Sequence, residues 1–193
     1  MIVELTGGVG SGKSRILEFL KEEYGAEILQ TDETARQLQQ KGEEGFRKMV
    51  EILGDGVLGP DGQLDREKTA RRLFQDPAAL EAVNSSIHPM VWDRIHGQAR
   101  ASKAPLVVVE SAVPDQNPND IYDEVWYVYT RKEVRIQRLM ESRGYSREKS
   151  LQVMERQLPE EAYRAGADRV IDNSGDFEET KQQIRQITEG KAG

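Results

Sequence analysis

The sequence predicts an α/β protein built on a five-stranded parallel sheet. Five short apolar runs alternate with segments in which apolar residues recur at helical spacing. Strands that are separated by helices pair in parallel, and the helices cover both faces of the sheet. The run over 106–109 contains no polar residue, which is typical of a strand buried on both faces. The predicted strands cover residues 2–5, 26–29, 106–109, 125–129 and 169–171.

The composition is that of a globular chain with a strongly charged surface. Its 193 residues, 37% of them hydrophobic and 32% charged, suffice for one substantial domain or a core with subdomains. The net charge of −7 disfavours duplex binding, so we expect no nucleic-acid partner. The chain has no cysteine, which excludes disulfides and a cysteine nucleophile. Neither a secretory leader nor an apolar run of membrane length is present, so we expect a cytoplasmic protein without a membrane partner.

A glycine-rich loop joins the first predicted strand to the first predicted helix. It reads Gly7-Gly8-Val9-Gly10-Ser11-Gly12-Lys13-Ser14 and matches G-x-x-x-x-G-K-[ST], the P-loop. The backbone N–H groups of such a loop point inward toward phosphate oxygens, and the helix that follows adds its positive dipole end. The dinucleotide fingerprint G-x-G-x-x-G fails, because Lys13 stands where its last small residue is needed. We therefore expect a nucleoside triphosphate here, with Lys13 on the β- and γ-phosphates and the Ser14 hydroxyl on Mg²⁺.

Residues 32 to 103 are predicted to be almost entirely helical. Asp65 and Asp76-Pro77 are typical helix beginnings. The turn residues between 54 and 62 indicate a short hairpin. His88-Pro89 predicts a break between two helices, because the residue before a proline avoids helical geometry. The expected helices run from Asp32 to about Gly42 and over 45–53, 65–74, 76–87 and 90–101.

The C-terminal half continues the alternation of strand and helix. A polar loop is expected over 114–119, between the third and fourth strands. Helices are expected over 132–143 and from Ser146 to just before Pro159. A last helix, opened by a capping box of Asp176 and Glu179, extends to about residue 188.

Residues far apart in this sequence are expected to share one crevice, because ligands of parallel α/β sheets bind at the carboxyl ends of the strands. Asp32 follows the second strand and Glu110 ends the third. Beside a P-loop, the Asp32 carboxylate can orient an acceptor hydroxyl and take its proton. The competing role for Asp32 is a helix N-cap. Glu110 either binds a metal or a water there, or merely closes a buried strand.

Arg131, Arg135 and Arg138 recur at i, i+4 and i+7 and therefore share one face of the 132–143 helix. Their guanidinium groups can clamp a triphosphate and stabilise charge on the transferred group. The alternative is a solvated face on which they pair with nearby glutamates. We expect at least one of the three to serve the phosphates. His88 is either structural or a ligand, and the Asn173-Ser174-Gly175 segment either holds a base through its backbone or only turns the chain.

With these residues in view, the chain resembles the dephospho-coenzyme A kinases over nearly its whole length. The P-loop alone is shared by many families, whereas the remaining pieces in this order are far more particular. The pieces that carry the resemblance are 5–14, Asp32 with Ala35-Arg36, Gly62-Gln63-Leu64-Asp65-Arg66, Val83-Asn84 with His88-Pro89, Arg138-Leu139 with Arg143, Gln157, and Ala167-Asp168-Arg169-Val170-Ile171-Asp172-Asn173.

The resemblance implies a P-loop kinase core with a five-stranded parallel sheet, a helical substrate-binding insertion and a helical lid. The core would comprise residues 1–31, 104–131 and 167–193, the insertion residues 32–103, and the lid residues 132–166. ATP and Mg²⁺ would serve to phosphorylate the ribose 3′-hydroxyl of dephospho-coenzyme A, the last step of coenzyme A synthesis.

The resemblance also implies roles for single residues of this chain. Asp32 would be the base, acting with Lys13 and Arg138, and Ser14 would be the metal ligand. The nucleotide would contact Gly8, Val9, Gly10, Ser11, Gly12, Lys13, Ser14, Arg15, Arg138, Arg143, Asn173 and Gly175. Asp32, Arg36, Arg66, His88 and Glu110 would lie on the substrate side.

Two positions and one segment depart from the family's pattern. Gln30 stands where the family usually has the first of two aspartates, and Arg15 stands where threonine is common. The segment 111–115 replaces an apolar stretch that is expected to line the acceptor pocket.

The rival hypotheses are another P-loop kinase for a nucleoside or nucleotide, and an inactive nucleotide-binding paralogue. We expect a monomer or a weak homo-oligomer.

Overall fold

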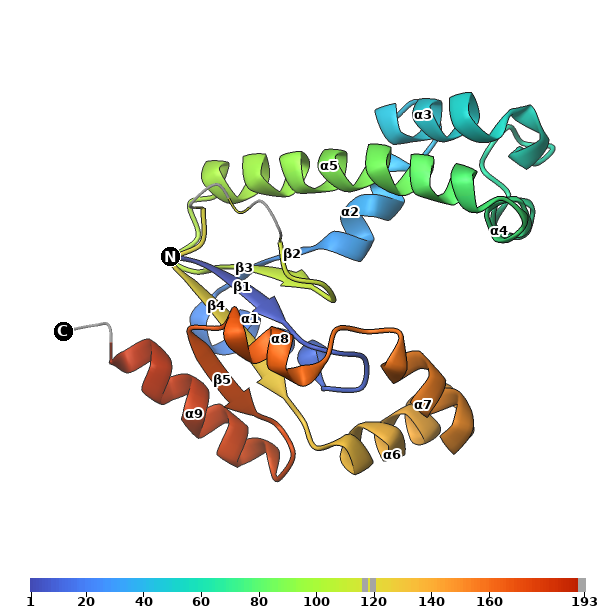
Figure 1. The fold of residues 1–193 in the computed structure, drawn as a ribbon. Helices are drawn as coiled ribbons and strands as arrows, with labels where there is room; N and C mark the ends of the chain where they lie inside the picture. The colour runs from blue at the N-terminus through green and yellow to red at the C-terminus, as the bar shows by residue number, and fades with distance from the viewer. Residues whose placement is uncertain (116–117, 119–120, 191–193) are drawn as a thin grey trace. The chain divides into compact units, whose positions relative to one another are not determined.

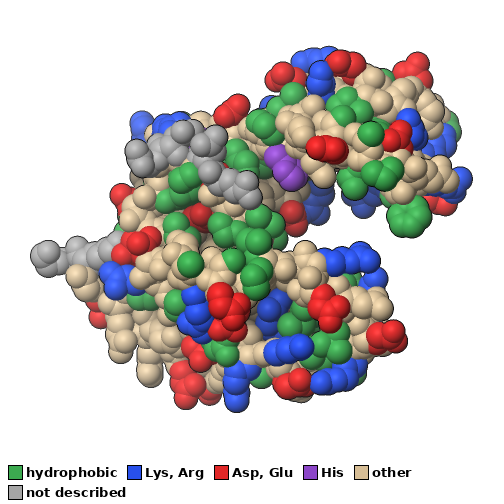
Figure 2. Space-filling model, in the orientation of Figure 1, with side chains coloured by type: hydrophobic (Ala, Val, Ile, Leu, Met, Phe, Trp, Pro, Cys, Tyr) green, Lys and Arg blue, Asp and Glu red, His purple; other side chains and the backbone are tan. Residues whose placement is uncertain are grey.

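The chain folds into two compact units in the computed structural model, which describes residues 1–115, 118 and 121–190 (Figure 1). One unit comprises Met1–Ile28 and Ser102–Gly193, and the other comprises Leu29–Ala101. Part of the loop predicted over 114–119 lies outside the described residues. No helix in the described residues is both long and apolar enough to cross a membrane. Acidic and basic side chains are interspersed over the face shown in Figure 2, as the composition predicts.

The predicted five-stranded parallel sheet is confirmed. Its order is β2-β3-β1-β4-β5. In β1 the last residue, Thr6, lies opposite Ser111 of β3 and Tyr127 of β4, so these strands end near the same edge. β2 begins in the first unit and leads directly into the second. The strands are β1 (Ile2–Thr6), β2 (Glu27–Gln30), β3 (Val107–Ser111), β4 (Glu124–Tyr129) and β5 (Arg169–Asp172).

Two helices of the first unit, α1 (Lys13–Tyr24) and α9 (Phe177–Glu189), cover one face of this sheet. Phe19 of α1 and Phe177 of α9 meet edge to face, with ring centroids 6.3 Å apart. Trp126 of β4 is fully buried beneath them in the same core. Its neighbour Tyr127 points to the opposite face, where the ring of Tyr163 stacks on it at 5.1 Å. Burial of each such side chain contributes about 1.5–3 kcal/mol.

The segment after β4 forms three helices, α6 (Lys132–Arg143), α7 (Arg147–Glu155) and α8 (Glu160–Ala165). The prediction of a helix over 132–143 is confirmed, and Gly144 ends it in the left-handed conformation. Ser146 caps α7 by accepting a hydrogen bond from the backbone N–H of Lys149 at 3.1 Å. The prediction for α7 runs a few residues too far, and α8 is not predicted at all. A helix of six residues is too short to show an apolar period.

The second unit is helical, as predicted. It contains α2 (Thr31–Leu38), α3 (Glu44–Leu53), the 3₁₀ turn η1 (Asp55–Val57), α4 (Arg66–Gln75) and α5 (Pro77–Ala101). The helices α2, α3 and α4 all pack against α5. Asp65 caps α4, and the predicted hairpin is present as a bridge between Leu58 and Leu64.

The predicted helix break at His88-Pro89 is wrong, since α5 continues through Pro89 without interruption. The buried residues Val83, Ile87, Val91 and Ile95 recur every four positions along α5 and form one apolar stripe. Pro89 itself is exposed, on the side away from this stripe. A proline inside a helix costs about 3 kcal/mol. Packing of a continuous stripe against three helices outweighs that local cost.

Candidate active site

The glycine-rich loop connects β1 to α1 as predicted, and it bends through backbone conformations that favour glycine. Gly10 has φ 77° and Gly12 has φ 88°, both in the left-handed region. Gly12 is the N-cap residue of α1, and no side chain caps that helix. No side-chain oxygen therefore caps the start of α1, and a helix N-terminus suits an anion. This arrangement fits the phosphate groups of a nucleotide.

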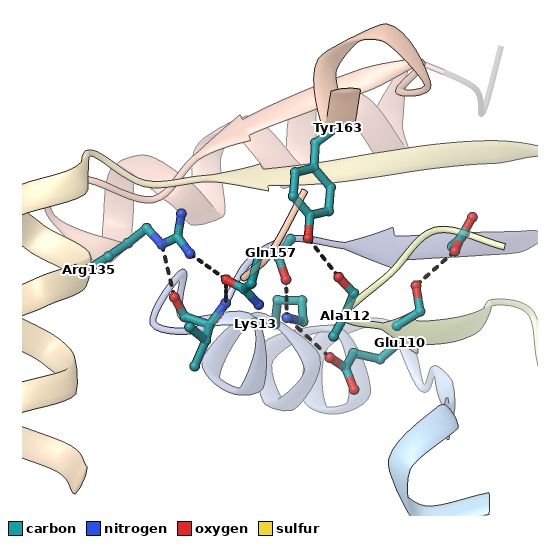
Figure 3. A network of polar contacts seen from close by, with 10 residues as sticks. Lys13, Glu110, Ala112, Arg135, Gln157 and Tyr163 are labelled. Carbon is teal, nitrogen blue, oxygen red and sulfur yellow. Dashed lines mark hydrogen bonds and ion pairs between the residues drawn. The ribbon is translucent and has the colours of Figure 1, made fainter. Parts of the chain in front are cut away.

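Lys13 and Glu110 are brought together at this loop. The Nζ atom of Lys13 donates to the carbonyl oxygen of Gly7 at 2.5 Å and lies 3.3 Å from Oε1 of Glu110 (Figure 3). Both side chains are largely buried, with exposed fractions of 11% and 14%. Ser14, the next residue of α1, is exposed. The expectation that Glu110 shares an edge of the sheet with the loop is therefore met, although its partner is the P-loop lysine.

Three side chains converge on the carbonyl oxygen of Ser11 in the middle of the loop. Thr130 Oγ1 donates at 2.9 Å, Asn173 Nδ2 at 2.8 Å and Arg138 Nη1 at 3.2 Å. The other end of the Asn173 amide is also engaged, because its Oδ1 accepts from Thr180 Oγ1 at 3.0 Å. Asn173 thus holds the loop with its side chain, a role that the sequence pattern did not predict.

Arg138 lies between the loop and the end of β5. Besides its contact with Ser11, its Nη2 donates to the carbonyl oxygen of Asn173 at 2.8 Å. Burial lowers the pKa of Arg138, and the neighbouring charge of Arg15 lowers it further. Arg15 itself lies over the Phe177 ring, 4.0 Å from its centroid. The structure therefore gathers Arg138, Asn173 and Arg15 around the start of α1, where they add positive charge and donors.

Arg135, one turn before Arg138 on α6, contacts an earlier part of the loop. Its Nε donates to the carbonyl oxygen of Val9 at 2.9 Å, and its Nη2 donates to Oε1 of Gln157 at 2.8 Å (Figure 3). Burial lowers the pKa of Arg135. No local sequence signal places Gln157 here, since it lies 148 residues from Val9, whose N–H donates to it.

Arg135 and Arg138 therefore contact the glycine-rich loop, whereas Arg131, the N-cap residue of α6, is exposed. The third member, Arg131, donates its backbone N–H to Ser174 Oγ at 2.9 Å. Glu133, one of the nearby glutamates of the alternative interpretation, pairs instead with Arg147 at 2.8 Å. Arg143, in the last turn of α6, is exposed and forms no hydrogen bond or ion pair with the described residues. Gly175 lies in the exposed turn before α9, beside the Glu179 carboxylate.

Asp32 lies in the first turn of α2, in the second unit. The N-cap position belongs to Gln30, which makes no side-chain capping bond, so the capping role considered for Asp32 is not the one it has. The Asp32 side chain is exposed, and within the described residues no hydrogen bond or ion pair engages its carboxylate. Arg36 lies one turn later, with Nε donating to the Asp32 carbonyl oxygen at 3.2 Å.

Arg66 and His88 are also in the second unit, on two further helices. Arg66 is the first residue of α4, and His88 lies in the middle of α5. Both are exposed, and neither forms a hydrogen bond or ion pair within the described part of the chain. The structure thus presents all four predicted substrate-side residues of this unit at its surface, but it does not link Arg66 or His88 to Asp32.

The segment after β3 is held by residues that sequence reasoning missed. The buried Glu4 carboxylate accepts, through Oε1, from Ser111 Oγ and from the Asp115 N–H, both at 2.8 Å. Burial raises the pKa of Glu4, although these two hydrogen bonds act in the opposite direction. Tyr163 donates its hydroxyl to the carbonyl oxygen of Ala112 at 2.8 Å (Figure 3). The sequence feature that could have indicated this role is the position of Glu4 inside an otherwise apolar strand.

Comparisons with known proteins agree on one family. The family described as dephospho-CoA kinase matches residues 1–179. A dephospho-CoA kinase of Geobacter sulfurreducens is 34% identical over 96% of this chain and 96% of its own length. One from Moorella thermoacetica is 36% identical over 95% of this chain and 89% of its own length.

Solved structures support the same fold. The crystal structure of TT1252 from Thermus thermophilus superimposes with a TM-score of 0.79 at 28% identity, covering 100% of this chain and 98% of that one. A dephospho-CoA kinase from Campylobacter jejuni has a TM-score of 0.71 at 20% identity, with 98% of each chain covered. A shikimate kinase from Acinetobacter baumannii, with a TM-score of 0.57 at 16% identity over 100% and 95% of the two chains, shares the fold alone.

Proposed function

Because this chain belongs to the dephospho-CoA kinase family, we propose that it transfers the γ-phosphoryl group of ATP to the ribose 3′-hydroxyl of dephospho-coenzyme A. The products are coenzyme A and ADP. The enzyme is a phosphotransferase with an alcohol as acceptor, and its reaction is the last step of coenzyme A biosynthesis.

The observation that carries this proposal is the loop between β1 and α1. Its glycine conformations, the uncapped start of α1 and the position of Lys13 together suit the phosphate chain of ATP. Lys13 supplies positive charge for the β- and γ-phosphates. Arg138, placed against the loop from α6, adds a second cation that stabilises the charge on the transferred group. Arg15, Arg143, Asn173 and Gly175 belong to the nucleotide side of the site.

Asp32 is the proposed general base. It accepts the proton of the 3′-hydroxyl as the hydroxyl oxygen bonds to the γ-phosphorus and the bond from that phosphorus to ADP breaks. Two facts support this role: the Asp32 carboxylate is exposed, and no described residue engages it. A carboxylate that accepts a hydrogen bond in a helix cap, or that pairs in a salt bridge, would have to break that contact before it could accept a proton.

The remaining substrate contacts are assigned to Arg36, Arg66, His88 and Glu110. The first three are exposed on the second unit, where cationic or hydrogen-bonding groups suit the phosphates and the base of the acceptor. Glu110 pairs with Lys13 and so orients the lysine. The segment 111–115, held by Glu4 and Tyr163, lines the acceptor pocket in this proposal.

Mg²⁺ is the proposed metal, with the Ser14 hydroxyl as its protein ligand. Ser14 is exposed in the first turn of α1, directly after Lys13, which fits a magnesium ion that keeps water and phosphate oxygens as its other ligands. Such an ion neutralises charge on the β- and γ-phosphate oxygens when it is bound.

The segments take their roles from this reaction. Residues 1–31, 104–131 and 167–193 form the nucleotide-binding core, residues 32–103 bind the acceptor, and residues 132–166 act as the lid.

The net charge of −7 supports the absence of a nucleic-acid partner. We place the enzyme in the cytoplasm, as a monomer or a weak homo-oligomer.

The test is an assay of ADP release by the purified protein with ATP and Mg²⁺. Parallel reactions contain no acceptor, dephospho-coenzyme A, adenosine, or members of a panel of nucleoside monophosphates. The expected result is release that depends on dephospho-coenzyme A, together with a product carrying a new 3′-phosphate by mass and by nuclear magnetic resonance.

The other outcomes decide between the rival hypotheses. Turnover with a different acceptor alone would move the substrate and keep the kinase. ATP binding without any acceptor-dependent turnover would favour an inactive nucleotide-binding paralogue. Omission of Mg²⁺ in the same assay tests the metal, since turnover unchanged in the presence of a chelator would contradict the assignment to Ser14.

A further inference from the structure

We propose that Gln157 and Arg135 are positioning residues for the nucleotide-binding loop. They fix its conformation before ATP binds, because one bonds to the backbone N–H of Val9 and the other to its carbonyl oxygen. This inference rests on the proposed function, since the loop is taken to bind ATP. Neither residue is assigned a contact with the nucleotide. They act through the backbone of Val9, and their effect is on the free energy of ATP binding.

The contacts form a closed set of three hydrogen bonds. Gln157 Oε1 accepts from the backbone N–H of Val9 at 2.9 Å and from Arg135 Nη2 at 2.8 Å. Arg135 Nε donates to the Val9 carbonyl oxygen at 2.9 Å. Both backbone groups of one loop residue are thereby fixed, and the two side chains that fix them also bond to each other. Figure 3 shows the two side chains meeting beside the loop.

The space around Gly8 shows how closely the two side chains approach the loop. A Cβ atom at Gly8 would meet the Arg135 guanidinium and would lie 2.8 Å from Oε1 of Gln157. The φ angle of Gly8 is not in the left-handed region. Glycine is therefore required here for the space that the two side chains fill, and the Arg135–Gln157 pair lies directly on the loop.

The same contacts describe a role for Arg135 that acts through the loop backbone. Two of its nitrogen atoms, Nε and Nη2, already donate to protein acceptors, and its side chain is desolvated. The Val9 N–H is likewise occupied by Gln157 and not available to a phosphate oxygen. Gln157 and Arg135 instead fix the backbone conformation of the loop.

Order in the loop has a predictable effect on affinity. Fixing a residue's backbone costs conformational entropy, and a loop that is ordered beforehand does not incur this cost when ATP binds. Gln157 follows α7 and Arg135 lies on α6, so the loop is tied to the segment proposed as the lid. Loss of the pair should weaken nucleotide binding while the chemical groups of the site stay in place.

The experiment compares Gln157→Leu, Gln157→Glu and the control Gln137→Leu in the full-length protein. Leucine matches the volume of glutamine and cannot accept a hydrogen bond. Glutamate keeps the acceptor for Val9 and Arg135. Gln137 lies on α6 with its amide on Glu141, away from the loop. The dissociation constant of ADP is measured by calorimetry without acceptor, and KM and kcat are measured in the kinase assay.

Gln157→Leu is expected to raise the ADP dissociation constant and the KM for ATP about tenfold, with the KM for the acceptor and kcat changed less than about twofold. Gln157→Glu should restore most of the affinity, and Gln137→Leu should behave as the parent. Unchanged ADP affinity in Gln157→Leu, or equal loss in the leucine and glutamate variants, would overturn the proposal. Because ADP binding needs no acceptor, these outcomes remain readable if the proposed reaction fails.

A double-mutant cycle checks that the two residues act as one unit. Arg135→Met alone and Gln157→Leu alone should each weaken ADP binding, and the double variant should be little worse than either. Additive losses would contradict a shared role at Val9. Urea denaturation of each variant shows whether it is folded, so that a general loss of structure is not mistaken for a loss of affinity.

Discussion

The side-chain amide of Asn173 donates to the carbonyl oxygen of Ser11 at 2.8 Å, joining the end of β5 to the glycine-rich loop across 162 residues of sequence. Asn173 is buried, and its Oδ1 accepts from Thr180 Oγ1 at 3.0 Å. Both ends of one amide are therefore satisfied only in the folded chain. The last strand of the sheet thus takes part in holding the loop that follows the first strand.

Asn173→Asp is expected to damage this connection more than its small chemical change suggests. The variant keeps an acceptor for Thr180 but loses the donor to Ser11 and places a carboxylate oxygen against that carbonyl. Loss of the hydrogen bond costs about 0.5–1.5 kcal/mol. The carboxylate oxygen adds repulsion against the Ser11 carbonyl, which still accepts from Thr130 and Arg138. Urea denaturation should show such a loss, and titration with ADP should show weaker binding. Thr180→Val, which leaves the Ser11 contact in place, is the control, and a larger loss of ADP affinity in the control would contradict the prediction.

Asp32→Asn should separate catalysis from nucleotide binding. Asparagine cannot take the proton of the acceptor hydroxyl, so kcat should fall about 10²- to 10⁴-fold. The KM for ATP should change less than about twofold, because the proposed role lies at the acceptor. Steady-state kinetics of Asp32→Asn and of the control Glu33→Gln, an exposed carboxylate one residue later, measure both quantities. Near-parental kcat in Asp32→Asn would remove the assignment of the base.

Lys13→Ala should affect the nucleotide end of the reaction. The variant removes the cation proposed for the β- and γ-phosphates and leaves Glu110 without the ion pair seen at 3.3 Å. We expect turnover to fall by about 10²-fold or more, as for the removal of one preorganised transition-state contact. Lys21→Ala, on the same helix, is the matched control. A variant at Lys13 with turnover within a few-fold of the parent would contradict the P-loop role.

Glu4→Gln should change how stability depends on pH. Burial raises the pKa of Glu4, so between the ordinary carboxyl pKa and that raised pKa the folded chain binds more protons than the unfolded chain. The contribution of Glu4 to stability is therefore fully present below the ordinary carboxyl pKa and is lost as the pH rises through the raised pKa. Glutamine keeps the Oε1 acceptor for Ser111 and Asp115 without the charge. The groups that face this carboxylate, Asp115 and Tyr122 among them, remain in the variant.

Urea denaturation from pH 4 to pH 8 measures the Glu4 effect. The free energy of unfolding of Glu4→Gln relative to the parent should increase with pH and then level off. Glu18→Gln, at an exposed carboxylate on α1, should show no such trend. A difference between Glu4→Gln and the parent that decreases with pH would contradict the sign of the shift.

Pro89→Ala should stabilise the second unit. Alanine restores the backbone donor that proline lacks and removes the steric strain of a proline inside a continuous helix, a difference of up to about 3 kcal/mol. Chemical denaturation measures the gain. Asn84→Ala, at another exposed position of α5, gives the smaller gain expected from helix propensity alone, about 0.5 kcal/mol. A gain at position 89 no larger than at position 84 would show that α5 accommodates its proline without strain.

The sequence by itself determined the parts of this protein that depend on neighbouring residues. Short apolar runs predict strand β3 and the other strands of the sheet. The helix caps at Asp65 and Ser146 depend on side chains that bond only a few residues ahead. The glycine-rich loop depends on backbone conformations that glycine adopts locally. The order of apolar and polar residues also determined the α/β class, since alternating elements leave few ways to bury a sheet.

Only the tertiary structure decided the features that depend on distant partners. Gln157 meets Val9 and Asn173 meets Ser11 across well over a hundred residues, and no periodic pattern encodes such pairs. The continuity of α5 through Pro89 was likewise decided by packing, because the apolar stripe that contacts α2, α3 and α4 contributes more than one proline costs. Local sequence signals act over one or two turns, whereas side chains in a packed fold are placed by whatever element covers them.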